Sequence, residues 1–204
     1  EDTRRTGMLL HEITKQLSDF VESPKPRLIS YYEQNEEGKI AEILSLLASG
    51  LSVALVSDAG TPTISDPGYK LVRTCIEKGI RIESIPGPSS VVTALTVSGL
   101  PTDKFLFVGY PPKKEGHRKD FYNQLVKMGD VIKTTVILFE APHKLLGTLA
   151  EMENVFGKEK KLVICRELTK MHEEVLRDSI ANLLAHFTKT PPKGELVILF
   201  HTKD

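Results

Sequence analysis

The stretch SGLSVALVSDAGTPTISDPGYKLVRTCIEKGIRIESI, from Ser49 to Ile85, decides the fold class. Its apolar segments Leu51–Val56 and Ile80–Ile85 predict two buried strands, and apolar residues between them recur at helical spacing. Gly50 and Gly79 stand just before these strands, where the end of a helix favours a left-handed residue. A strand, a helix and a strand within about thirty residues predict a β-α-β unit. We therefore expect a parallel sheet with a right-handed crossover.

Patterns on both sides extend this α/β assignment. Asp2–Val21 predicts an amphipathic helix that Pro24 and Pro26 close, Arg27–Tyr31 a short strand, and residues 40–47 a second helix. Further helices are predicted at Ser90–Ser98, Asp120–Met128, 145–155 and Ile180–Phe187, and strands at Phe105–Gly109, Thr135–Phe139, Leu162–Arg166 and Leu196–His201. The stretch from 167 to Arg177 fits neither pattern. We predict two α/β domains, residues 1–101 and 102–204, joined near Pro101.

Composition constrains the function only in general terms. The 204 residues include 27 Lys plus Arg and 27 Asp plus Glu, so any basic surface must be local. Cys75 and Cys165 stand in separate apolar stretches and are predicted to be reduced thiols. No apolar run approaches the roughly 20 residues that a membrane helix needs. We expect a cytoplasmic protein without membrane contact.

The loop Ser57–Gly68, SDAGTPTISDPG, follows the first predicted strand at the sheet edge where ligands bind. Asp58 and Asp66 disfavour phosphate and suit a cation or ribose hydroxyls, which S-adenosylmethionine offers without any phosphate. The alternative is a tight turn in which Asp66 caps the next helix. A second loop, Ile85–Ser90, is predicted at the adjacent strand end, where its two serines either cap a helix or line the same pocket.

Several motifs occur in order along nearly the whole chain: EDTRRTGMLL, LVSDAGTPTISDPGYKLVR, IPGPSSVVTALTVSGLPTDKFLFVGYPP, ILFEAPHKL, VICRELTK and PPKGELVI. Together they resemble the tetrapyrrole-methylase-type, class III methyltransferases. More narrowly, they resemble the members that methylate the ribose 2′-hydroxyl of a cytidine in the decoding region of 16S rRNA. The resemblance implies two α/β domains with the cofactor cleft between them, a homodimer, and S-adenosylmethionine without a metal. It also implies that a first strand and a loop of the family's N-terminal domain are missing here.

The same resemblance places cofactor contacts at Asp58, Gly60, Thr61, Ser89, Ser90, Glu140, Ala141, Leu168 and Gly194. A ribose hydroxyl needs a base before it attacks a methyl group. The candidates are Glu1, Asp2, Asp66, Glu140, Glu167 and His143. We select Glu167 as the base, with Lys170 and Arg166 holding phosphate, and keep Asp66 as a further catalytic residue.

Residues 113–119 carry the cations Lys113, Lys114, Arg118 and Lys119. Beside Tyr110, this predicted loop either grips the RNA backbone or is a solvated surface loop. Two other functions remain open. One is methylation of a tetrapyrrole of the cobalamin or siroheme pathways, which would require a deep apolar acceptor pocket. The other is an inactive dimerising or RNA-binding fragment, because the family's first strand is missing.

Overall fold

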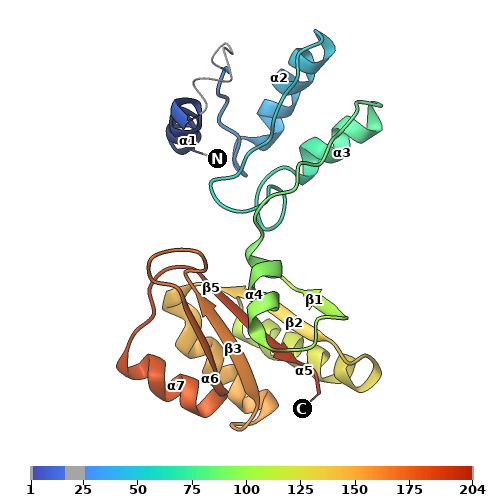
Figure 1. The fold of residues 1–204 in the computed structure, drawn as a ribbon. Coiled ribbons are helices and arrows are strands. Elements are labelled where there is room, and N and C mark those ends of the chain that lie inside the picture. Colours follow the sequence, from blue (N-terminus) through green and yellow to red (C-terminus); the bar gives the residue numbers. More distant parts are fainter. Residues whose placement is uncertain (1, 17–25, 204) are drawn as a thin grey trace. The chain divides into compact units, whose positions relative to one another are not determined.

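The computed structural model describes residues 2–16 and 26–203 and divides the chain into two compact units, Glu1–Pro88 and Ser89–Asp204 (Figure 1). The domain boundary predicted from the sequence lies later, after residue 101. Between the two positions lies helix α4 (Ser90–Ser98), which contacts strands of the second unit. None of the helices in these described ranges is long and apolar enough to cross a membrane.

The second unit is built on a five-stranded sheet in the order β1-β2-β5-β3-β4. Strand β1 runs parallel to β2, whereas the other neighbouring pairs are antiparallel. Its strands are β1 (Phe105–Phe107), β2 (Thr135–Glu140), β3 (Lys161–Arg166), β4 (Glu174–Ser179) and β5 (Leu196–His201). Four of them confirm predicted strands, and β4 occupies the stretch that the sequence pattern left unassigned.

Helices cover both faces of this sheet. The helices α5 (Glu115–Val131), α6 (Leu145–Phe156) and α7 (Ile180–Lys189) pack on one face, and the short η1 (Pro142–Lys144) leads into α6. On the other face α4 packs against Ile137, Val163 and Leu199. This helix, sheet and helix layering agrees with the predicted α/β class.

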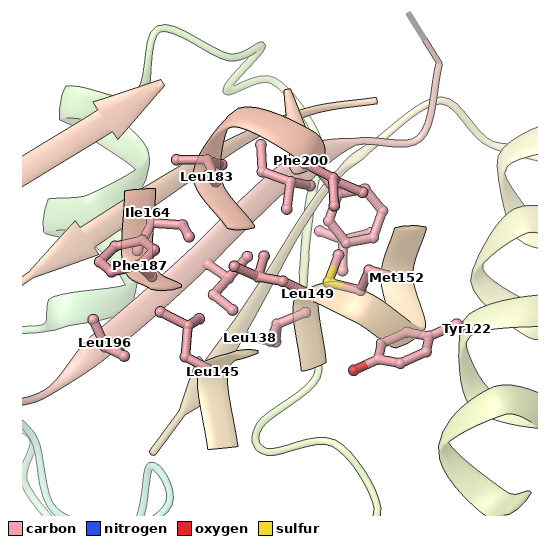
Figure 2. Packing of buried hydrophobic residues seen from close by; sticks show 14 of the residues in the cluster. Tyr122, Leu138, Leu145, Leu149, Met152, Ile164, Leu183, Phe187, Leu196 and Phe200 are labelled. Atoms are coloured by element: carbon pink, nitrogen blue, oxygen red, sulfur yellow. The ribbon is translucent and has the colours of Figure 1, made fainter. Parts of the chain in front are cut away.

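The larger core lies between the sheet and the helices α5 to α7. Figure 2 shows strand residues packed against residues from these helices: Leu138, Ile164, Leu196 and Phe200 with Tyr122, Leu145, Leu149, Met152, Leu183 and Phe187. Each fully buried Leu side chain contributes about 1.5–3 kcal/mol by leaving water. This burial fixes the helices on the sheet and so fixes the loops between them.

The first unit contains α1 (Thr3–Gln16), α2 (Glu36–Ala48) and α3 (Tyr69–Glu77). All three helices were predicted, although the expected end of the first, at Val21 and Pro24, lies outside the described residues. Helix α2 ends before Gly50, whose φ of 85° is the left-handed conformation expected there. A small cluster centred on Tyr31, Ile43, Leu71 and Cys75 holds α2 and α3 together.

The three strands predicted for this unit are wrong. Within the described part of residues 1–88 no strand forms, and the segments 27–31, 51–56 and 80–85 pair with nothing in a sheet. Apolar side chains in them are exposed, with Leu51 at 56% and Ile85 at 81%. An apolar run becomes a strand only when a neighbour completes its hydrogen bonds. The predicted β-α-β unit is therefore not formed, and residues 2–16 and 26–203 contain a single mixed sheet.

Candidate functional site

The strands β1, β2 and β3 run in one direction, so their carboxyl ends lie at the same edge of the sheet. Leu196 of β5 is paired with Glu140 on one side and with Arg166 on the other. The segments 140–141, 166–168 and 194–195 therefore lie side by side, and we call them the carboxyl edge. Four of the predicted cofactor contacts, at Glu140, Ala141, Leu168 and Gly194, are brought together here.

At this edge the side chain of Glu167 rests directly on Gly194. Glu167 Oε1 accepts hydrogen bonds from the backbone N–H of Glu195 at 2.8 Å and from Lys170 Nζ at 2.9 Å. A Cβ atom on residue 194 would lie 2.4 Å from Glu167 Cδ, and the φ of Gly194 is 85°. Only glycine fits both conditions. The conformation of the turn before β5 is thus tied to the carboxylate of Glu167.

These contacts also set the charge of Glu167. The hydrogen bond from the Glu195 backbone and the ammonium of Lys170 hold the pKa of the Glu167 carboxyl below its usual value. The same pairing with Glu195 and Glu167 raises the pKa of Lys170. A carboxylate that holds its charge so firmly accepts a proton less readily. The contacts favour a positioning role for Glu167 over the general-base role predicted for it.

Glu140 is buried, with 4% of its surface exposed. Its Oε1 accepts a hydrogen bond from the N–H of Ala141 at 2.8 Å, and its Oε2 accepts one from the hydroxyl of Thr148 on α6. The carbonyl of Ala141 accepts a hydrogen bond from the N–H of Lys144 at 2.9 Å. Glu140 thus shapes the turn from inside the protein. Sequence reasoning missed Thr148, although a threonine among the apolar residues of α6 was a usable signal.

Aromatic side chains extend the carboxyl edge towards β1. Phe139 lies 4.8 Å from Phe107 and 5.6 Å from Tyr110 between ring centroids. The N–H of Phe139 donates to the carbonyl of Gly109 at 2.9 Å, which holds the end of β1 in place. Tyr110 is 58% exposed and so presents part of its ring to solvent.

Ser89 and Ser90 open helix α4 on the other face of the sheet. Ser89 occupies the N-cap position, as predicted, but its hydroxyl makes no capping hydrogen bond among the described residues. Val91, the next residue of α4, is buried in the cluster against which Leu168 also packs. The start of α4 and the segment after β3 are therefore linked through one apolar cluster.

In the first unit, the loops 57–68 and 85–88 lie side by side. The Thr61 hydroxyl donates to the carbonyl of Pro88 at 2.7 Å. Gly60 has a φ of 75°, and the nearest described atom to a Cβ placed there is the same Pro88 oxygen, at 3.9 Å. Asp58 accepts a hydrogen bond from the N–H of Asp2 at 3.0 Å and lies 3.8 Å from Arg5 Nε. Asp58 thus joins the start of α1 to the loop.

The capping role considered for Asp66 is wrong, because α3 begins at Tyr69 and Gly68 occupies its N-cap position. The end of the loop is held by Glu36, which is only 6% exposed. Glu36 Oε1 accepts hydrogen bonds from the Tyr31 hydroxyl at 2.9 Å and from the Gly68 N–H at 3.1 Å. Nothing in the sequence distinguished Glu36 from an ordinary acidic residue in the first turn of a helix.

The predicted basic loop 113–119 is partly helical, since α5 begins at Glu115. Arg118 binds Glu151 of α6, with Nε 2.6 Å from Oε2, and also donates to the carbonyl of Lys113 at 2.7 Å. The guanidinium of Arg118 is therefore engaged in bonds within the protein. Three cations of this segment are exposed: Lys113, Lys114 and Lys119. Arg166, also predicted to contact RNA, donates to Glu174 on β4 at 2.9 Å.

Comparisons with known proteins agree on one family. Residues 3–184 match the profile of the Tetrapyrrole (Corrin/Porphyrin) Methylases. The chain is 41% identical over 199 residues to the ribosomal RNA small subunit methyltransferase I of Synechocystis sp., covering 98% of the chain and 67% of that protein. Its namesake in Thermotoga maritima is 39% identical, with 100% and 85% covered, and the one in Vibrio cholerae is 40% identical, with 98% and 66% covered.

Solved structures share the fold at lower identity. A cobalt precorrin-4 methyltransferase superposes with a TM-score of 0.60 at 19% identity, covering 89% of this chain and 78% of that one. Uroporphyrin-III C-methyltransferase from Thermus thermophilus, in complex with S-adenosyl homocysteine, gives 0.54 at 16% identity, with 83% and 75% covered. At such identities the likeness concerns the fold alone.

Proposed function

The chain belongs to the tetrapyrrole methylase family and, within it, to the ribosomal RNA small subunit methyltransferases I, and from this premise we propose its reaction. It transfers a methyl group from S-adenosylmethionine to the ribose 2′-hydroxyl of a cytidine in the decoding region of 16S rRNA. The observation that carries the proposal is the identity of about 40% to those enzymes over nearly the whole chain. By the same resemblance, the protein acts as a cytoplasmic homodimer on the small ribosomal subunit.

The residues present fit a cofactor without phosphate. At the carboxyl edge the two cations near Glu167 are already paired, Lys170 with Glu167 and Glu195, and Arg166 with Glu174. The loop 57–68 offers carboxylates and an open backbone at Gly60. Within the described residues, no group of three or more His, Cys, Asp and Glu is placed to hold a metal ion.

We assign cofactor binding to the predicted residues in each unit: Asp58, Gly60 and Thr61 in the first, and Ser89, Ser90, Glu140, Ala141, Leu168 and Gly194 in the second. Glu140 contributes through the shape of the Ala141 turn, because its carboxylate is bonded inside the protein. Gly60 lets the ligand approach the backbone, whereas the space beside Gly194 is filled by the side chain of Glu167. The cleft expected between the two domains stays a prediction.

S-adenosylmethionine, when bound, supplies a methyl group on a positively charged sulfur. The chain's own residues must align the attacking oxygen and help it lose its proton. We assign Glu167 and Lys170 to alignment, since their mutual contacts hold the segment 167–170 against the 194–195 turn. In place of Glu167, the base selected from the sequence, we propose Asp66, another of the candidates, as the proton acceptor.

The acceptor RNA carries one negative charge per nucleotide, which exposed lysines attract. Lys113, Lys114 and Lys119 are exposed before and within the first turns of α5, and Tyr110 presents its ring nearby in the sequence. Arg118 supports this surface through its bond to Glu151. We propose that these lysines bind the RNA backbone and that Arg166, paired with Glu174, contributes less.

The test is transfer of tritium from labelled S-adenosylmethionine, with small ribosomal subunits and a tetrapyrrole as separate acceptors. We expect label in 16S rRNA at one cytidine ribose. Label in the tetrapyrrole and none in RNA would overturn the assignment in favour of the tetrapyrrole alternative. The other alternative is a chain without methyltransferase activity. Calorimetry with S-adenosylmethionine tests it, because an absence of binding would favour that alternative.

A further inference from the structure

A buried hydroxyl on α6 contacts the carboxyl edge from the sheet face that α6 covers. Thr148 is 3% exposed and lies on the face of α6 that packs against the sheet. Its hydroxyl donates to Glu140 Oε2, at the last position of β2. Helix α6 thus contacts the end of β2 through a polar group as well as through the apolar core.

The bond from Thr148 is the first of two in series. The other oxygen of the same carboxylate, Glu140 Oε1, accepts the N–H of Ala141 at 2.8 Å. A carboxylate held at both oxygens cannot rotate without breaking one bond, and inside a protein a lost bond leaves a costly unpaired group. The orientation of the Ala141 N–H therefore depends on the hydroxyl of Thr148.

The turn at Ala141 is fixed from its other side by Pro142. Ala141 has ψ of 141°, the extended conformation that a following proline favours. The carbonyl of Ala141 is held by the N–H of Lys144, and its N–H is held by Glu140. The turn lies beside the segments 166–168 and 194–195.

We propose that Thr148 is a positioning residue for the methyl-donor site, acting through Glu140 on the Ala141 turn. The proposal rests on the proposed function, because it assumes that the carboxyl edge binds S-adenosylmethionine.

Thr148 itself belongs to α6 and reaches the turn only through the Glu140 carboxylate. If it positions that carboxylate, removing its hydroxyl weakens cofactor binding, whereas a serine at the same position restores it. A purely structural threonine would change stability and leave the affinity of the folded protein unaltered.

Thr135 offers a matched control. It is fully buried at the opposite end of β2, and its hydroxyl donates to the carbonyl of Pro101 at 2.7 Å. Thr135→Val and Thr148→Val each replace a buried hydroxyl by a methyl group and each remove one hydrogen bond. Only the second bond leads to the carboxyl edge.

The experiment measures the dissociation constant for S-adenosylmethionine by calorimetry and the melting temperature by circular dichroism, for the 204-residue chain and its variants. We expect Thr148→Val to weaken binding at least about fivefold, the loss of one hydrogen bond to a charged group. Thr148→Ser and Thr135→Val should stay within about twofold of the unsubstituted chain. Equal binding by Thr148→Val, or equal weakening by Thr135→Val, would overturn the proposal.

A second measurement separates this proposal from the function on which it rests. Amide hydrogen exchange at Ala141, without any ligand, should be faster in Thr148→Val than in Thr135→Val, and unchanged exchange would overturn the positioning role. If the unsubstituted chain binds no S-adenosylmethionine while Ala141 exchanges faster in Thr148→Val, the proposed function fails and the coupling of Thr148 to the turn stands.

Discussion

Tyr122 carries a buried hydroxyl that forms no hydrogen bond of regular geometry within residues 2–16 and 26–203, although Thr148 lies beside it. The side chain is fully buried beside Thr148 and Glu140, and this burial raises the pKa of the Tyr122 hydroxyl, which therefore stays neutral. A buried polar atom without a partner costs about 1–3 kcal/mol. We predict that Tyr122→Phe leaves the free energy of unfolding unchanged or raises it by about 1 kcal/mol, as measured by urea denaturation.

Tyr31 is the control for this substitution, because it is also buried but donates its hydroxyl to Glu36 at 2.9 Å. Tyr31→Phe should speed amide exchange at Gly68, whose N–H is bonded to the same Glu36 oxygen. A loss of more than about 1 kcal/mol in Tyr122→Phe would show that the Tyr122 hydroxyl has a stabilising partner after all.

Glu167 makes stability depend on pH in a defined direction. Its pKa is lowered from an ordinary value of 4.5 in the folded chain, so the unfolded chain binds more protons near that pH. The stabilisation is present above pH 4.5 and is lost as the pH falls through the lower folded-state pKa. We predict that the melting temperature falls more between about pH 5 and pH 3 in the unsubstituted chain than in Glu167→Gln. Parallel curves of melting temperature against pH would contradict the pairing of Glu167 with Lys170 and the Glu195 N–H, since all other carboxylates are common to the two proteins.

The site residues that could be predicted from sequence are those in short local motifs, such as EAPHK around Glu140 and RELTK around Glu167. Their partners could not be predicted in the same way. Arg118 and Glu151 are 33 residues apart, and no local pattern pairs them. The role of Glu167 likewise depends on Glu195, which only the register of β3 and β5 brings beside it.

Helix α4 is held at its carboxyl end by a side chain from β4. Arg177 donates from Nε to the carbonyl of Ser98 at 3.0 Å and from Nη2 to that of Val97. A cation at the carboxyl end of a helix also interacts favourably with the helix dipole. We predict that Arg177→Met lowers the free energy of unfolding by about 1 kcal/mol and speeds amide exchange in α4, as measured by mass spectrometry.

Arg73 of α3 provides the comparison. It forms an exposed pair with Glu77 one helical turn away, at 2.9 Å. Such a pair contributes about 0.3–0.5 kcal/mol, so Arg73→Met should change stability by less than Arg177→Met. The capping role of Arg177 is refuted if the two substitutions have equal effects.

Helices and strands differed in how well the sequence predicted them. Helices such as α4 and α6 make their hydrogen bonds locally, so spacing and end residues were enough to place them. A strand depends on its neighbour. Residues 51–56 have the sequence pattern of a strand but pair with no other described strand. By contrast, EVLRDS, residues 174–179, forms β4 because β3 pairs with it over six positions.

The two compact units differ in the core that each one buries. In the second unit, fifteen buried residues form the cluster under α5 to α7, and eight more lie under α4. The corresponding cluster in the described part of the first unit has four. Large apolar side chains such as Met8, Leu51 and Ile85 are more than half exposed there. Since burial of apolar surface is the main favourable term in folding, stability must be concentrated in the second unit.

This difference predicts that residues 89–204 fold alone and residues 1–88 do not. All five strands and both larger clusters lie within 89–204, so the fragment keeps every contact of its sheet. We expect one cooperative urea transition for 89–204, and expect Leu149→Ala, at a fully buried position, to lower its free energy of unfolding by about 2–5 kcal/mol. For residues 1–88 we expect no cooperative transition, because four buried apolar residues gain too little to offset the entropy of the ordered chain. A cooperative transition in 1–88, or a gradual one in 89–204, would contradict the inference that stability is concentrated in the second unit.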